Sequence, residues 1–311
     1  MTDKKTAFLI ITLIFCMSLL SCNNTQLPSD SGAQQTPPPR KKVGLVLGGG
    51  GAKGAATLGA LKVIEQSGLK IDYIAGTSIG AIIGALYSAG YSADELRDLF
   101  ASLKWQELLQ ANMLETKFKD LLLERGVSSF TDLKIPFRCV AVNVNTERDE
   151  EFGSGQVYQA IRASMTIPPL YKPIELNGEK YVDGGFINNL PVDVVKKMGA
   201  EVVIAIDLQQ SEEETDFQHV AEIINRMNIA DMIGDFLGDV LGKEYKFAFN
   251  YFKNRPDTVK YVVNKSNADV YINPVLTNFN AASFGSNNCF VMFGRGEDEA
   301  KKFVNDLQKL K

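Results

Sequence analysis

The chain has 311 residues, of which 45% are hydrophobic and 23% charged, which suits one large or two small globular domains. Its formal net charge is -4 without a long run of one sign. Nucleic acid is therefore not expected as a partner, because phosphate binding needs a basic face. Four cysteines, two of them near the N-terminus, indicate neither a disulfide framework nor a zinc site.

The N-terminal segment 1–21 consists of a short apolar run behind a basic flank. Lys4 and Lys5 precede the apolar residues 7–20, which would reach ~21 Å as a helix, short of the ~30 Å bilayer core. These features predict a signal peptide. Its end, Leu-Leu-Ser followed by Cys22, resembles the lipobox of bacterial lipoproteins, which implies cleavage before the cysteine and a diacylglyceryl group on its sulfur. An uncleaved anchor and an ordinary signal peptide are the alternatives.

The following residues, 22–42, lack apolar periodicity and include a proline triplet at 37–39. We expect a disordered tether that begins at lipidated Cys22, followed by one folded domain over 43–311. Several acyl chains on one cysteine would hold the protein firmly to a membrane. The expected location is therefore the bacterial cell envelope, on a membrane facing the periplasm or at the cell surface.

From position 43 onward, strand-like and helix-like patterns alternate. Apolar runs and turn signals predict strands at 43–47, 73–75, 137–144, 181–183, 202–208 and 270–272, and helices at 55–67, 78–88, 157–163, 191–198 and 297–310. Ser92 and Glu95 have the spacing of a capping box at the start of a further helix. Strands separated by helices indicate an α/β fold, a three-layer sandwich with a mainly parallel central sheet covered on both faces. The stretch 217–252 is expected to form amphipathic helices, as a lid or as part of the core.

A glycine-rich loop, 48–54, lies between the first strand and the first helix. Glycines let successive backbone N–H groups turn toward one point, and the helix start adds a positive dipole end. Such a loop can hold a phosphate or a developing oxyanion, although a tight turn is the purely structural alternative. A dinucleotide site would need an acidic residue at the end of the second strand, whereas Asp72 precedes that strand.

The second motif is Gly-Thr-Ser-Ile-Gly at 76–80, where a short strand turns into a helix. This is the setting of a nucleophile elbow, in which the serine, Ser78, occupies a cramped turn. Its neighbours two places away must be small, and Gly76 and Gly80 meet that requirement. The turn would present the hydroxyl at the N-terminus of the helix, where an oxyanion is favoured.

The third motif is an aspartate turn after a strand, Asp183 with Gly184 and Gly185. A plain Asp-Gly turn is the structural alternative. The chain has one histidine, His219, in a polar stretch that is expected to face solvent. If Ser78 reacts without it, Asp183 is the candidate base. A carboxyl with a pKa of ~3.9 is a poor base, and burial would improve it by raising that pKa.

The three motifs, in this order, resemble the patatin-like phospholipases. The segments 162–168 and 189–193 also resemble the bacterial branch of that family, which is related to the neuropathy target esterase domain. The resemblance is strong over 43–208 and weaker beyond, where 268–274 looks like the last strand of the family.

The resemblance implies a Ser-Asp dyad, with Ser78 as nucleophile and Asp183 as base. It also implies that the glycine loop supplies the N–H groups of the oxyanion hole, at Gly49, Gly50 and Gly51. Lys53 and Gly54 would support that loop. The implied reaction is hydrolysis of a lipid acyl ester through an acyl-enzyme, without a metal or organic cofactor.

Three other interpretations remain open from the residues alone. One is an α/β-hydrolase with a Ser-Asp-His triad that uses His219. Another is a nucleotide- or phosphate-binding module on the glycine loop. The third is a lipoprotein without catalytic activity that binds a lipid or a partner. The patterns do not indicate a headgroup, a positional preference or an oligomeric state.

Overall fold

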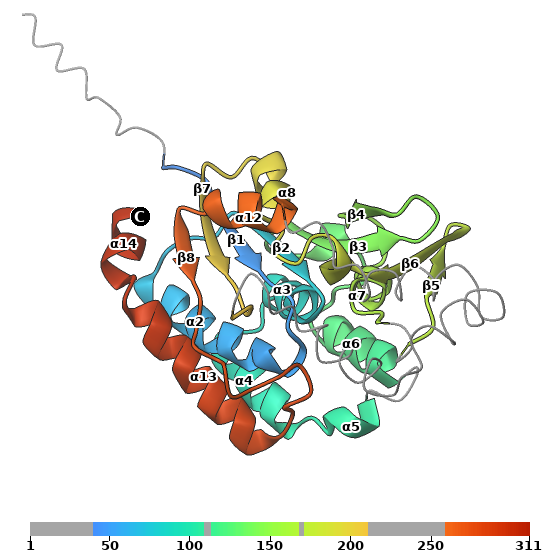
Figure 1. Cartoon of the computed structure of the whole chain (residues 1–311), viewed down its shortest axis with the longest axis horizontal. Helices are drawn as coiled ribbons and strands as arrows, with labels where there is room; N and C mark the ends of the chain where they lie inside the picture. Colours follow the sequence, from blue (N-terminus) through green and yellow to red (C-terminus); the bar gives the residue numbers. More distant parts are fainter. Residues whose placement is uncertain (1–39, 109–112, 168–170, 211–258) are drawn as a thin grey trace, which may run out of the picture. The chain divides into compact units, whose positions relative to one another are not determined.

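The computed structural model describes residues 40–108, 113–167, 171–210 and 259–311 (Figure 1). The chain divides into two compact units, 1–39 and 40–311, and every described residue belongs to the second. Within the described ranges, no helix is both long and apolar enough to cross a bilayer.

The second unit is built on one eight-stranded sheet. Its strands are β1 Val43–Leu47, β2 Tyr73–Thr77, β3 Phe137–Asn143, β4 Arg148–Phe152, β5 Ile174–Leu176, β6 Glu179–Asp183, β7 Val202–Ile206 and β8 Val270–Ile272. The described helices are α2 Gly54–Ser67, α3 Ile79–Ala89, α4 Ala93–Ser102, α5 Trp105–Leu108, α6 Met113–Glu124, α7 Val157–Ser164, α8 Val192–Met198, α12 Val259–Ser266, α13 Ser286–Lys301 and α14 Val304–Lys309. Three short 3₁₀ turns are η1 Gly51–Lys53, η2 Phe130–Asp132 and η3 Gly184–Phe186.

The sheet is mixed but mostly parallel. Its hydrogen-bonded order is β5-β6-β3-β2-β1-β7-β8, with β4 also pairing with β3. The strands β1, β2, β3, β7 and β8 run parallel, whereas β4, β5 and β6 form the antiparallel part. Strands β4 and β5 and helices α5, α6 and α12 were not predicted. Strand β4 is largely charged and only partly buried, so it lacks the apolar run used as a strand signal.

Helices cover both faces of the sheet, which confirms the predicted three-layer α/β fold (Figure 1). On β1, Leu45 and Leu47 join the large core formed with α2, α3, α4 and α13. Val46, on the opposite face, joins a second core with Val194 and Val195 of α8. The central strands therefore read as continuous apolar runs because both of their faces are buried.

The second unit starts inside the segment expected to be a tether. The guanidinium of Arg40 donates two hydrogen bonds to the carboxylate of Asp72, at 2.8 and 2.7 Å. The same carboxylate accepts a hydrogen bond from the N–H of Val43 at 2.8 Å. Asp72 therefore fastens the start of β1, with the residue Arg40 before it, to the start of β2, and residues 40–42 belong with the fold.

The predicted closing helix at 297–310 is wrong in its boundaries. The structure has two helices there, α13 and α14, and α13 begins at Ser286. Glycines at 294 and 296 weaken the helical signal in the sequence. Packing explains the glycine at 296, because α13 lies directly against α2 (Figure 1). A Cβ atom on Gly296 would lie 1.8 Å from the carbonyl oxygen of Ala56, and one on Gly59 would lie 1.9 Å from that of Phe293.

Gly296→Ala should therefore destabilise the domain, by about 2 to 5 kcal/mol, because the new methyl group meets backbone that cannot move without separating two helices. Gly294→Ala, in the same helix, is the matched control: nothing lies within 4 Å of its Cβ position. That control should be neutral or stabilising by about 1 kcal/mol, since alanine favours a helix over glycine. Urea unfolding of both variants measures the difference, and equal stabilities would contradict the packing account.

Candidate active site

Ser78 occupies a strained turn between β2 and α3. Its backbone has φ 56° and ψ -121°, a left-handed φ that serine rarely adopts and that costs of order 1–3 kcal/mol. The turn is cramped as expected. A Cβ atom on Gly76 would lie 2.3 Å from the carbonyl oxygen of Gly80, and one on Gly80 would lie 2.1 Å from that of Leu47. A side chain at either position would therefore meet backbone atoms.

The strained serine is held by a hydroxyl that sequence analysis did not single out. The backbone N–H of Ser78 donates to Oγ of Ser164, at 3.0 Å, and that Oγ donates to the carbonyl of Val140 at 2.6 Å. Ser164 ends α7 and is completely buried. It thereby ties the elbow to β3. The only sequence signal was its place within 162–168, the segment that resembled the family without a stated role.

Strand register brings the aspartate to the serine. Strand β4 pairs with residues 139–143 of β3 and therefore occupies one edge of it. Strands β2 and β6 must share the other edge, and there Thr77 pairs with Val140 while Asp183 pairs with Ala141. Because β2 is parallel and β6 antiparallel to β3, the two strands meet end to end at these rows. Ser78, the next residue after β2, therefore lies beside Asp183.

The turn after Asp183 needs a glycine where it passes over β3. A Cβ atom on Gly184 would lie 2.2 Å from the carbonyl oxygen of Val140 and 3.1 Å from Cγ2 of Thr77. The N–H of Gly185 donates to Oδ1 of Asp183 at 2.7 Å. The close approach to β3 thus explains glycine at 184, and the backbone N–H of Gly185 orients the carboxyl.

The carboxyl of Asp183 is fully buried. Within the described ranges, no group makes a well-formed hydrogen bond to its Oδ2 atom. Burial raises the pKa of Asp183 to about 7, because it disfavours the charged form. Hydrogen bonding from the Ser78 hydroxyl and from the N–H of Gly185 opposes this rise in pKa. The hydroxyl is thus close enough to act on the carboxyl, and one carboxyl oxygen is available to accept its proton.

The glycine loop lies against the serine. The Cβ position of Gly49 is 3.2 Å from Cβ of Ser78, but its N–H donates to the carbonyl of Asn189 at 3.2 Å. In the described part of the chain, no group accepts a hydrogen bond from the N–H of Gly50 or Gly51. Of the three glycines expected to supply oxyanion N–H groups, the open donors are therefore the second and the third.

Lys53 and Gly54 support this loop in the structure. The Lys53 side chain is buried, and its Nζ donates to the carbonyl of Leu208 at 3.1 Å, just beyond β7. A Cβ atom on Gly54 would lie 2.5 Å from Cγ1 of Ile79, so α2 can start close to α3 only with glycine there. The loop is thereby fixed between β7 and the serine helix.

A buried amide, Asn188, joins the aspartate turn to the serine turn. Its carbonyl accepts from Oγ1 of Thr77 at 2.8 Å, and its N–H donates to the carbonyl of Gly184 at 2.8 Å. Its side chain donates to Asp193 at 3.0 Å and accepts from Asn264 at 3.0 Å. Sequence analysis had noted only its neighbours, 189–193, as part of a resemblance.

Comparison with known proteins gives the same family as the motifs. Residues 45–196 match the family model described as patatin-like phospholipase. The chain therefore contains a patatin-like phospholipase domain. The resemblance stated from the three motifs is confirmed at this level, whereas the bacterial branch stays a prediction.

Two relatives of the patatin-like domain illustrate the match. Lysophospholipase NTE1 of Phaeosphaeria nodorum is 35% identical over 190 residues, which cover 56% of this chain and 12% of that protein. The patatin-like phospholipase domain-containing protein ZK370.4 of Caenorhabditis elegans is 35% identical over 196 residues, which cover 55% of this chain and 14% of that protein. The chain thus spans a small part of the length of these relatives.

A solved structure shares the fold of the patatin-like domain. VipD from Legionella pneumophila superposes with a TM-score of 0.53 at 14% sequence identity, covering 86% of this chain and 67% of that one. At this identity the likeness concerns the fold alone.

Several expectations fall on residues outside the described ranges. They are the signal peptide 1–21, the tether up to residue 39, the lipid anchor on Cys22, the triad alternative with His219, and the amphipathic stretch 217–252. They stay predictions, together with the cell-envelope location that depends on the anchor.

The burial of Asp183 has a measurable effect on stability. A carboxyl whose pKa rises on folding, from ~3.9 to about 7, stabilises the protein below pH 4 and loses that contribution as pH rises to 7. Asp183→Asn should therefore stabilise the protein, with a gain that grows between pH 5 and pH 8 to at most ~4 kcal/mol. Urea unfolding of the wild type and the variant at pH 5 and pH 8 measures this gain in stability.

Asp72→Asn is the control, for which the change in unfolding free energy should have the opposite sign. Burial alone would raise the pKa of Asp72, but hydrogen bonds from Arg40 and the N–H of Val43 hold that pKa below its ordinary value. This carboxylate therefore stabilises the fold at neutral pH, and its replacement should destabilise the protein at pH 8. A gain for Asp183→Asn that is identical at pH 5 and pH 8 would contradict the raised pKa.

Proposed function

We propose that this protein is a serine acyl-hydrolase of the phospholipase or lysophospholipase type, which cleaves acyl esters of lipids. The observation that carries the proposal is the position of Ser78, in a strained turn, beside the desolvated carboxyl of Asp183. The family match over 45–196 supports the substrate class.

The first half of the reaction forms an acyl-enzyme. Oδ2 of Asp183 takes the proton of the Ser78 hydroxyl while Oγ attacks the carbonyl carbon of the ester. The carbonyl oxygen becomes an oxyanion, which the open N–H groups of Gly50 and Gly51 stabilise. The N–H of Ile79, first in α3, lacks an acceptor within its helix and is a third donor. Asp183 then gives its proton to the leaving alkoxide, and the C–O bond of the ester breaks.

The second half returns the enzyme to its starting state. Water gives a proton to Asp183 and attacks the acyl carbonyl, and the same N–H groups hold the second oxyanion. Collapse breaks the acyl–Oγ bond, and the proton on Asp183 returns to Ser78. The products are the free fatty acid and the alcohol, and each proton is accounted for by one carboxyl.

A carboxyl with a pKa of about 7 suits this cycle. It is half ionised near neutral pH, so it can accept a proton from serine and return it to the leaving group without a large free-energy gap. An exposed aspartate would bind that proton too weakly. Burial thus supplies what histidine supplies in a Ser-His-Asp triad.

The deciding experiment compares three variants on lysophosphatidylcholine and phosphatidylcholine, with fatty acid release measured by mass spectrometry. Ser78→Ala and Asp183→Asn should each lower turnover at least ~10³-fold, and Ser78→Ala should abolish labelling by a fluorophosphonate. His219→Ala is the control and should keep the wild-type rate. Loss of turnover in that control would support the Ser-Asp-His alternative, and wild-type release by Ser78→Ala would reject the serine mechanism.

The dependence of kcat/KM on pH provides a separate test. Because the base must be ionised, the rate should rise about tenfold per pH unit below pH 7 and level off above it, following the pKa of Asp183. Steady-state rates between pH 5 and 9 on a soluble ester measure this limb. A limb centred near pH 4 would show that the reacting base is not a buried carboxyl.

A further inference from the structure

Helix α12 contacts the candidate site from outside the segment that matches the family. It covers Val259–Ser266, whereas the family match ends at residue 196. The helix lies beside α8 (Figure 1). Of its eight residues, only Asn264 is buried. Because an apolar side chain would be the usual choice for one buried position, the amide must be explained by its partners.

The amide of Asn264 uses all of its hydrogen-bonding groups. Its Nδ2 donates to Oδ1 of Asn188 at 3.0 Å and to Oδ1 of Asp193 at 3.1 Å. Its Oδ1 accepts from the N–H of Asp193 at 3.2 Å. An amide offers two N–H donors and one acceptor oxygen, and no other side chain of this size offers the same set.

The contact with Asn264 fixes the orientation of the Asn188 side chain. The Nδ2 atom of Asn188 donates to Asp193 at 3.0 Å and to Asp149, on β4, at 3.1 Å. Its Oδ1 accepts from Asn264. Asn188 is 1% exposed, so water cannot replace a lost partner without entering the core.

The backbone of Asn188 joins the two turns that carry the dyad. Its carbonyl accepts from Thr77, the residue before Ser78, at 2.8 Å. Its N–H donates to the carbonyl of Gly184, the residue after Asp183, at 2.8 Å. A displacement of Asn188 would therefore move both turns.

Helix α12 is held firmly enough to present this amide. The hydroxyl of Tyr261 donates to the buried carboxylate of Asp207, which follows β7. The Nζ atom of Lys260 pairs with Asp149 of β4. The helix is thus tied to two strands of the sheet, and its Asn264 has a fixed place between them.

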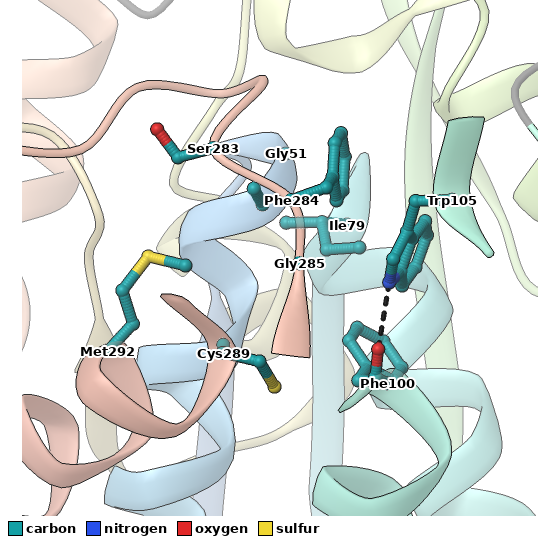
Figure 2. Close-up of a pocket in the computed structure, with 11 residues that line it drawn as sticks. Gly51, Ile79, Phe100, Trp105, Ser283, Phe284, Gly285, Cys289 and Met292 are labelled. Carbon is teal, nitrogen blue, oxygen red and sulfur yellow. Dashed lines mark hydrogen bonds between the residues drawn. The ribbon is translucent and has the colours of Figure 1, made fainter. Parts of the chain in front are cut away.

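The other side of the serine helix is apolar. A small pocket beside Ile79, the residue after the nucleophile, is lined mainly by apolar side chains (Figure 2). The indole N–H of Trp105 donates to the carbonyl of Phe100 at 2.9 Å, within this wall. Among the described residues, no side chain of the pocket hydrogen-bonds to the serine turn or the aspartate turn. Hydrogen bonds that brace the serine turn therefore come from Ser164 and Asn188.

We propose that Asn264 is a positioning residue for the dyad of Ser78 and Asp183, which acts through Asn188. The inference rests on the proposed function. Without the Asn264 amide, Oδ1 of Asn188 is a buried acceptor that lacks its donor, so this side chain turns away and the two turns separate. A displacement of ~1 Å between reacting groups can cost ~10²-fold in rate.

The test is steady-state hydrolysis of p-nitrophenyl butyrate by Asn264→Ala, with active sites counted by complete fluorophosphonate labelling. In this variant kcat should fall at least ~10-fold while KM changes less than ~3-fold, because the amide affects geometry rather than substrate binding. Asn264→Asp keeps the size and the acceptor oxygen but lacks both donors, so it should behave in the same way. It also serves if the alanine variant does not fold.

A double-mutant cycle tests whether the effect passes through Asn188. Asn188→Ala should lower kcat at least as much as Asn264→Ala does. Adding Asn264→Ala to Asn188→Ala should then lower kcat less than ~2-fold further, since the path is already broken.

Two control variants separate positioning from general loosening. Asn267→Ala removes an exposed asparagine just beyond α12, which bonds to Lys196 of α8 at 3.4 Å. Asp72→Asn loosens the start of β2, whereas Ser78 follows its end. Both controls should keep kcat per labelled site within ~2-fold of the wild type.

The outcomes distinguish this inference from the proposed function. Hydrolysis by the wild type with an unchanged kcat in both Asn264 variants overturns the inference and leaves the hydrolase. Losses in kcat that multiply fully in the double variant also overturn it, because Asn264 would then act independently of Asn188. A loss in Asp72→Asn equal to that in Asn264→Ala has the same consequence. Absence of ester hydrolysis by the wild type overturns the proposed function and, with it, this inference.

Discussion

The site depends on a carboxyl group kept out of water beside a hydroxyl. Transfer of a carboxylate from water into a protein interior is unfavourable, and the raised pKa of Asp183 lowers that cost because about half of the carboxyl groups stay protonated near pH 7. One carboxyl oxygen accepts a hydrogen bond from the N–H of Gly185, while the other accepts no well-formed hydrogen bond from the described residues. The buried carboxyl and the strained backbone of Ser78 both destabilise the folded state, so packing elsewhere in the domain must compensate for them.

The backbone around this pair is unusually crowded, and glycines make the crowding tolerable. Gly76, Gly80 and Gly184 each face a carbonyl oxygen at a distance that a Cβ atom could not occupy. Hydrogen bonds then fix what the glycines allow: Ser164 holds the serine turn to β3, and Asn188 holds the aspartate turn to β2. The two groups proposed to react are thus placed by strands and by buried polar contacts, as a preorganised site requires.

The glycine loop is packed against two other parts of the domain. One side of it faces Ser78, and its continuation into η1 contacts the segment that precedes α13. Lys53 ties the loop to the end of β7, and Ala52 donates to the carbonyl of Ala281, in the segment that carries Phe284. The open N–H groups of Gly50 and Gly51 are therefore held between two fixed contacts.

By itself, the sequence determined the α/β class, most strand and helix positions, and the two residues at the centre of the site. Local rules suffice for these features, because apolar runs, caps and cramped glycine turns are readable from neighbouring residues. Helix α13 was misjudged because Gly296 serves a contact with α2, which no local rule includes. Only the tertiary structure decided that Ser78 and Asp183 are adjacent, which open N–H groups the loop retains, and that Ser164 braces the turn. The adjacency of Ser78 and Asp183 follows from strand register along β3, and register depends on the packing of the whole sheet.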